Sequence, residues 1–343
     1  MRNPEQFSSP DSEEEKQEAA RTSGIIRIAG VSPEKEGEIL HEIKEQDFDV
    51  QEIDKKEREK TPEEVEIISG VLAAMPAFVR KHGGSPVPIK LEHIHIIDPD
   101  KLTDEEKASV RARGWSSYSP QKQRIFLVRG KTEENKLQLA HETAHEMVHF
   151  NAFQSASFNP KEEIISVRTR GLAIKTKEGE EGRLYFRAFD EAITEELVKR
   201  FDKECFGSIP GLAEELSARE KVRADWLAER TQKGLKGNSG VVSNFVVARG
   251  ESGADRIIPV NYSYAKERRK LKEIMEGIQK GNPEKFKTRE DVFNVFEEAY
   301  FTGKKVKIAR LIEKTYGKGA FRKLGEETKN LSGPDVKSGG EKP

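Results

Sequence analysis

Three histidines at four-residue intervals are the feature of this sequence best suited to chemistry. His141, His145 and His149 lie in HETAHEMVHF, which holds two overlapping copies of the pattern H-E-x-x-H. On a helix, residues four apart share one face and lie about 6 Å apart along the axis, so two imidazoles can bind one metal ion. The glutamate after the first histidine of each copy, Glu142 or Glu146, would lie beside that ion and could take a proton from water. The spacing therefore predicts a Zn²⁺ site on a helix.

Only two of the three histidines can bind the same ion. His141 and His149 are separated by about 12 Å of helical rise, whereas Zn–N bonds are about 2.0–2.1 Å long. Two registers stay open: His141 and His145 with Glu142, or His145 and His149 with Glu146. We favour the second, because Met147 and Val148 between its two histidines and Phe150 just after them are apolar, as expected for a buried helix.

A later acidic segment supplies a third candidate ligand. Residues 189–196 read FDEAITEE. The pair of motifs, HExxH on one helix and (D/N)EAIT(D/E) on a later one, resembles the gluzincin metallopeptidases of the thermolysin-like clan. The resemblance implies that Glu191 is the third zinc ligand and that Glu195 supports a ligand histidine through a hydrogen bond. Its specific residues lie only in the two motifs, and the 41 residues between His149 and Glu191 form a longer gap than in thermolysin.

The resemblance implies an enzyme that hydrolyses peptide bonds in a protein or peptide substrate. His145, His149 and Glu191 would hold Zn²⁺ and leave a fourth position for water, with Glu146 as the general base. The alternative is a zinc-stabilised binding module without catalysis, which would hold a protein partner on its C-terminal helices. An open metal position would favour the enzyme, and a fourth protein ligand would favour the binding module. The substrate and the oligomeric state stay open.

The elements that must position these residues follow from local patterns. Thr61 with Pro62 and Glu64 predicts the start of a helix, and Pro76 should kink or divide that helix. Two tyrosines, in NYSYAKERRK before a later helix, could reach a cleft as oxyanion donors, but tyrosines there are more often packing residues and are not assigned. A short helix is predicted to start at residues 103–106, and further helices near 132–153, 190–205, 212–229, 265–279, 289–301 and 306–316. Strands are predicted near 89–97, 115–118, 124–128, 164–175, 183–189 and 241–248.

This order of elements predicts an α+β fold. We expect a zincin-like body over residues 61–232, in which a small mixed sheet packs on the HExxH helix and the glutamate helix. A Gly-rich loop and a helical C-terminal subdomain should follow over residues 233–330.

The composition of the chain predicts its disordered segments, its compartment and the kinds of partner it can bind. The chain has 343 residues and a formal charge of −1, which argues against a nucleic-acid partner because phosphate binding needs a basic excess. Residues 1–60 carry 10 Lys or Arg against 17 Asp or Glu and few apolar side chains, so we expect them to be mostly disordered, with a short strand at residues 25–31. The tail, residues 331–343, should be disordered too. One cysteine, no signal peptide and no long apolar run predict a cytoplasmic protein without a membrane partner.

Overall fold

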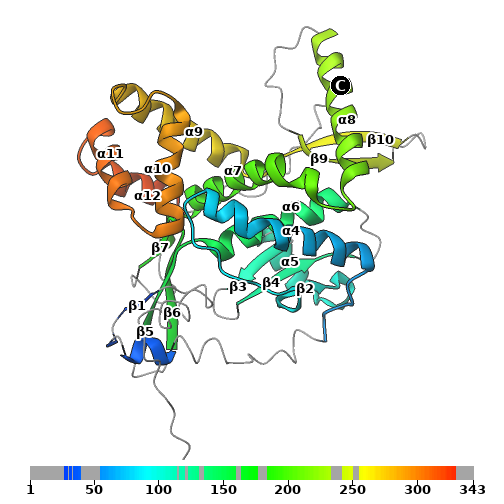
Figure 1. Ribbon diagram of the computed structural model, residues 1–343, viewed down its shortest axis with the longest axis horizontal. Coiled ribbons are helices and arrows are strands. Elements are labelled where there is room, and N and C mark those ends of the chain that lie inside the picture. Colours follow the sequence, from blue (N-terminus) through cyan, green and yellow to red (C-terminus); the bar gives the residue numbers. More distant parts are fainter. Residues whose placement is uncertain are drawn as a thin grey trace, which may run out of the picture.

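Figure 1 shows the computed structural model of the chain. The structure describes residues 27–29, 31–32, 34–39, 55–113, 116–119, 123–130, 135–159, 164–176, 184–232, 242–249 and 255–329. Two expectations of disorder lie outside these residues: the one before residue 55, apart from the short described stretches, and the one after residue 330. The Gly-rich loop at 233–240 lies outside them too.

The first long helix is α4 (Pro62–Lys81), and it begins where the sequence predicts. The hydroxyl of Thr61 accepts a hydrogen bond from the Glu64 amide, and the Glu64 carboxylate accepts one from the Thr61 amide, which is a complete capping box. Of the two outcomes predicted for Pro76, a kink or a division, the division is wrong, because the helix continues through this residue. The kink stays a prediction. Its buried apolar face extends to both sides of the proline and packs against α6, and this packing offsets the lost backbone hydrogen bond.

A small mixed sheet lies beside the candidate helix. It has the order β2 (Ile94–Ile97), β4 (Arg124–Val128), β3 (Ser116–Ser119), with β2 parallel and β3 antiparallel to β4. The strand predicted over 89–97 is shorter than expected, because residues 91–93 form a 3₁₀ turn. Among the described strands, β3 pairs with β4 alone, which makes it an edge strand of this sheet, and it contacts α6.

A second sheet extends from the C-terminal end of the same helix. Its order is β1 (Arg27–Ala29), β5 (Gln154–Asn159), β6 (Ile164–Arg170), β7 (Ala173–Lys175), β8 (Leu184–Tyr185). The short N-terminal strand expected within residues 25–31 is present and pairs in parallel with β5. Strand β5 itself was not predicted, since its sequence QSASFN has little apolar alternation.

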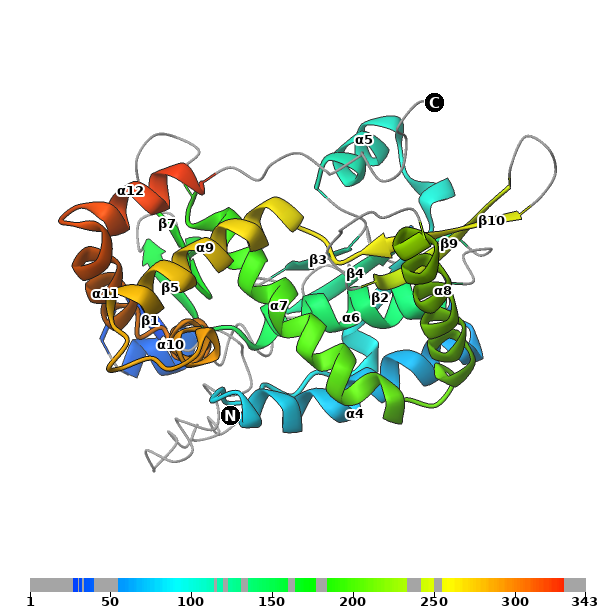
Figure 2. The ribbon, with the colours of Figure 1, turned by 90° about the horizontal axis from the view of Figure 1, so that it is seen from above.

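Helices α6 (Lys136–Asn151) and α7 (Arg187–Cys205) lie side by side in the centre of the molecule (Figure 2). Both are close to the predicted ranges. The remaining elements are helix α5 (Asp104–Arg113), helix α8 (Ala213–Gln232), the antiparallel pair β9 (Val242–Arg249) and β10 (Asp255–Asn261), and helices α9 (Ala265–Gly281), α10 (Arg289–Thr302), α11 (Val306–Tyr316) and α12 (Ala320–Glu327).

The chain thus has an α+β fold. Its buried apolar side chains form one main cluster that runs from α4 through α6 and α7 into α9–α12. The boundary expected near residue 232 stays a prediction, but the C-terminal helices share this core and α9 packs directly on α7. Among the described residues, no helix combines the length and apolarity needed to span a bilayer.

Candidate metal centre

The HExxH residues lie on α6, the most buried helix near the two sheets. Asn135 caps it by accepting a hydrogen bond from the Gln138 amide, so the helix is established two turns before the first histidine of the favoured motif. His145 and His149 are four residues apart on one face, and their ring centroids are 4.8 Å apart. Both side chains are buried.

Glu191, from the first turns of α7, points into the same space. Its Oε2 atom lies 3.2 Å from Nε2 of His145 and 3.0 Å from Nε2 of His149. The structure therefore brings together the three residues that the sequence proposed as zinc ligands, across 42 to 46 positions of chain.

The two distances from Glu191 and the donor types of the group are compatible with a zinc ion. Ligands at about 2.0–2.1 Å from a tetrahedral ion lie about 3.3 Å from one another, close to the two distances that Glu191 makes. Two imidazole nitrogens and a carboxylate oxygen are a common donor set for zinc. Among the described residues the group has three members and no fourth.

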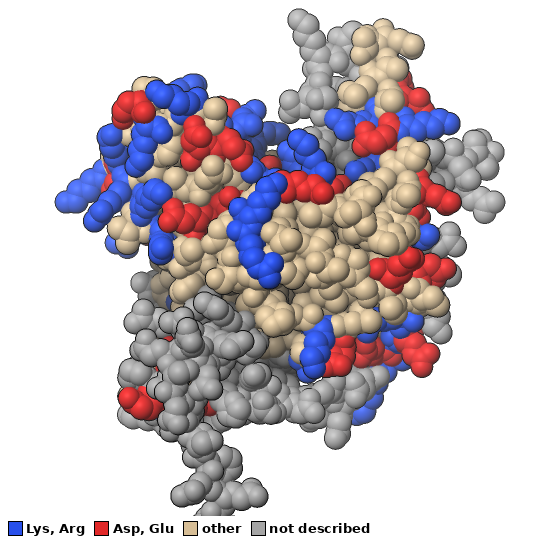
Figure 3. All heavy atoms as spheres, in the orientation of Figure 1, with Lys and Arg blue, Asp and Glu red and all other residues tan. Residues whose placement is uncertain are grey.

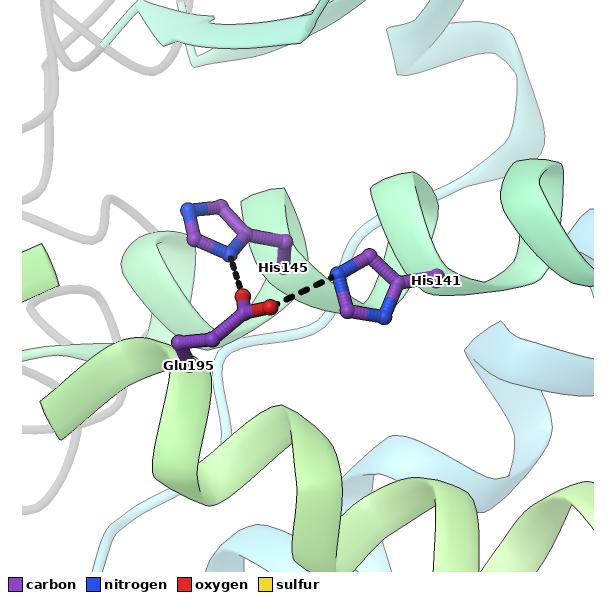
Figure 4. A group of neighbouring side chains, drawn as sticks. All are labelled: His141, His145 and Glu195. Carbon is purple, nitrogen blue, oxygen red and sulfur yellow. Dashed lines mark hydrogen bonds and ion pairs between the residues drawn. The ribbon is translucent and has the colours of Figure 1, made fainter. Parts of the chain in front are cut away.

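The second ring nitrogen of His145 is held by Glu195, one helical turn after Glu191. Nδ1 of His145 lies 3.0 Å from Oε2 of Glu195, and Nε2 of His141 lies 3.2 Å from Oε1 of the same carboxylate (Figure 4). The backbone amide of Ser263 donates the third hydrogen bond to this carboxylate, also at Oε1. A proton on Nδ1 of His145 would leave Nε2 free to bind a metal, which agrees with the supporting role that the resemblance implies for Glu195.

His141, His145 and Glu195 also form a second group whose atoms could hold an ion. This group corresponds to the alternative register. Its carboxylate, however, contacts the two imidazoles through different oxygens, and one of these also accepts the Ser263 amide. In the favoured group a single oxygen, Oε2 of Glu191, faces both Nε2 atoms. We therefore read Glu195 as a support for both imidazoles.

The second ring nitrogen of His149 faces a polar cluster from two helices. Its Nδ1 lies 3.3 Å from the hydroxyl of Tyr300 on α10 and 3.4 Å from the hydroxyl of Thr194 on α7. Thr194 in turn bonds Tyr300 and the backbone carbonyl of Asp190. A residue from the C-terminal helices therefore fixes the orientation of a candidate ligand, and the sequence offered no local signal for it.

The two candidate general bases have different surroundings. Oε1 of Glu146 accepts a hydrogen bond of 2.7 Å from Ser116 on the edge strand β3. Both oxygens of Glu142 are engaged instead, one by Gln138 and the other by Arg129. Since a general base needs a free oxygen near the reacting water, this arrangement favours Glu146.

Burial and the neighbouring charges together set the ionisation of the site. Burial lowers the pKa of His149 to about 4, so this imidazole is neutral at neutral pH, the form in which histidine binds a metal. Burial alone would also lower the pKa of His145, but its hydrogen bonds to Glu191 and Glu195 raise it well above the ordinary value, so a metal would have to displace a proton from this ring. Burial also raises the pKa of Glu146, which makes it a better proton acceptor than an exposed glutamate. For Glu191, burial is outweighed by His149 and His145, which hold its pKa well below the ordinary value.

Two further side chains border the site and were not assigned from the sequence. Arg170, the last residue of β6, donates a hydrogen bond to Oε1 of Glu191. Tyr264 stacks on the His145 ring, with the centroids 6.0 Å apart, and its backbone has a φ of 55°. The preceding residues hold it there, because Tyr262 bonds Asp202 on α7.

Comparisons with known proteins do not identify the chain: no family model, no curated protein and no solved structure matches it.

Proposed function

We propose that this protein is a zinc-dependent peptidase of the gluzincin type. The observation that carries the proposal is the convergence of His145 Nε2, His149 Nε2 and Glu191 Oε2 beside the buried carboxylate of Glu146. Bound zinc would polarise the scissile carbonyl and lower the pKa of a water molecule in the open position.

The residues of the chain supply the remaining chemistry. Glu146 would accept the proton of the attacking water and return it to the leaving amine. Glu195 would hold His145, and Tyr300 would hold His149, with Nε2 directed at the ion in each case. The hydroxyl of Tyr264 is a candidate hydrogen-bond donor to the developing oxyanion. Burial and the carboxylates around it raise its pKa, which keeps it protonated as a donor must be.

The edge strand β3 gives an extended peptide a place to bind. Its residue Ser116 contacts Glu146 directly, so a substrate strand that paired with β3 on the side away from β4 would pass the general base. Addition of a strand to a sheet edge uses backbone hydrogen bonds and therefore tolerates many peptide sequences. This arrangement supports a protein or peptide as the substrate.

The test uses the full-length chain, zinc analysis by mass spectrometry and hydrolysis of fluorescein-labelled casein. We expect about one zinc per chain, inhibition by a chelator, and loss of zinc in Glu191→Ala. Glu146→Gln should keep zinc and lose hydrolysis by a factor of about 10² to 10⁴. Glu142→Gln is the matched control, since it makes the same change in the other motif and should stay active. An inactive Glu142→Gln with an active Glu146→Gln would move the site to the first register. Unchanged zinc content in Glu191→Ala would refute the proposed metal site.

A second candidate function, a zinc-stabilised protein-binding module, is favoured by one feature. Helices α9, α11 and α12 line a groove of about 660 Å³ with apolar side chains such as Ile274 and Leu324, rimmed by lysines and glutamates. Figure 3 shows basic and acidic side chains interspersed over these helices. Wild-type protein that binds zinc but cleaves neither casein nor a mixed peptide library would favour this function.

A further inference from the structure

Arg170 lies against the candidate metal centre although nothing in the sequence motifs includes it. Its Nη2 atom is 3.3 Å from Oε1 of Glu191, and its Nε atom is 3.9 Å from Oδ2 of Asp190. We propose that Arg170 is a positioning residue of the metal centre, which holds one oxygen of Glu191 so that only the other faces the two histidines. This inference rests on the metal centre of the proposed function.

The two oxygens of Glu191 have separate partners. Oε2 faces the Nε2 atoms of His145 and His149, whereas Oε1 receives the hydrogen bond from Arg170. A carboxylate can bind a cation through one oxygen or through both. With Oε1 held by a guanidinium, Glu191 would bind an ion through Oε2 alone, which would leave a position for water or a substrate carbonyl.

The charge of Arg170 also matters to a site that is rich in carboxylates. Asp190, Glu191 and Glu195 are all buried within two turns of α7, and Glu146 faces them from α6. Arginine is always charged, and its planar fork can contact two carboxylates at once, which the single ammonium of a lysine cannot reproduce. Arg170 therefore partly neutralises the carboxylate ligand before and after an ion binds.

The fold holds Arg170 in place on both sides. As the last residue of β6 it is paired with Gln154 on β5 and with Ala173 on β7. The next residue, Gly171, has a φ of 52° and donates its amide to the carbonyl of Phe153. The amide of Leu172 then donates to the Asp190 carboxylate at 2.7 Å. The turn after Arg170 is thus docked on the start of α7, so the guanidinium is presented by rigid backbone and not by a free loop.

The experiment compares Arg170→Gln and Arg170→Lys with wild type. Arg168→Gln is the matched control, because Arg168 lies two residues earlier on β6 and bonds Ser157, away from the centre. Zinc affinity is measured by competition with a chromogenic chelator, and the absorption of the Co²⁺-substituted protein reports the coordination number. We expect Arg170→Gln to bind zinc about 10- to 100-fold more weakly and to change the cobalt spectrum towards higher coordination. Arg170→Lys should fall between Arg170→Gln and wild type, and Arg168→Gln should match wild type.

The outcomes separate this inference from the proposed function. Wild-type affinity and an unchanged cobalt spectrum in Arg170→Gln would overturn the positioning role while the peptidase proposal stands. An Arg170-dependent zinc site in a wild-type protein that cleaves no peptide would support the positioning role and overturn the peptidase. Wild-type protein that binds no zinc would overturn both. Urea unfolding of each metal-free variant shows whether that variant is folded. If Arg170→Gln is not folded, the cobalt spectrum of Arg170→Lys provides the test. A spectrum of Arg170→Lys identical to that of wild type would then overturn the positioning role.

Discussion

Replacing Glu195 with glutamine should separate its support of the metal centre from the general stability of α7. The Glu195 side chain is fully buried and accepts three hydrogen bonds, from His145, His141 and the amide of Ser263. Glutamine has nearly the same shape but puts an NH₂ group, which cannot accept, in place of one oxygen. At least one of the three donors therefore loses its acceptor.

The expected size follows from these contacts. A buried donor without a partner costs about 1–3 kcal/mol, so we expect the free energy of unfolding of the metal-free protein to fall by that amount. Loss of the partner that orients a ligand histidine typically weakens metal binding about 10- to 100-fold, and we expect this loss for zinc in Glu195→Gln.

The assay pairs urea unfolding without metal with zinc titration against a chelator. Glu196→Gln is the control, because Glu196, the residue next to Glu195, forms a partly exposed ion pair of 2.7 Å with Arg268. Such a pair is worth about 0–1 kcal/mol, and its loss should leave zinc affinity unchanged. Equal zinc affinity in Glu195→Gln, Glu196→Gln and wild type would refute the reasoning, since it would mean that the carboxylate does not orient His145.

Three other predictions follow from the same structure. Gly171→Ala should lower the free energy of unfolding by more than about 1 kcal/mol in urea titrations, because its φ is 52° and a Cβ would lie 2.3 Å from Asp190; a stability equal to wild type would contradict this geometry. Glu64→Gln should cost about 3 kcal/mol, since it breaks the buried two-bond ion pair with Arg58. Burial alone would raise the pKa of Glu64, but Arg58 and the helix cap lower it overall. The stabilisation by this ion pair is therefore complete above the unfolded pKa of about 4.3 and is lost as the pH falls through the lower folded pKa. The variant should lack this loss of stability when its unfolding is followed at decreasing pH. Zinc at 100 times its dissociation constant should add about 2.7 kcal/mol of stability, which a chelator removes and which Glu191→Ala should not show in thermal unfolding.

Several elements of this fold could be predicted because their signals are local. The capping box at Thr61, the helix that carries the three histidines and the helix that carries Glu191 each follow from residues within a few turns of one another. The four-residue interval between His145 and His149 already places both imidazoles on one face, whatever the rest of the chain does. Local patterns left alternatives open where tertiary packing also acts, as at Pro76, where a kink or a division was predicted and α4 is not divided.

Contacts between distant segments complete the centre, and no short pattern carries them. Tyr300 meets His149 across 151 positions of chain, and Ser263 meets Glu195 across 68. Arg170 reaches Glu191 only because a strand end docks on the start of α7. Side-chain spacing along one helix is set by covalent geometry and can be read from residue order, whereas the neighbours of a helix depend on how its buried faces pack. The candidate metal-binding residues, and Glu195 as a support for one of them, were therefore visible in the sequence. The supports that come from distant segments, such as Tyr300 and Arg170, were not.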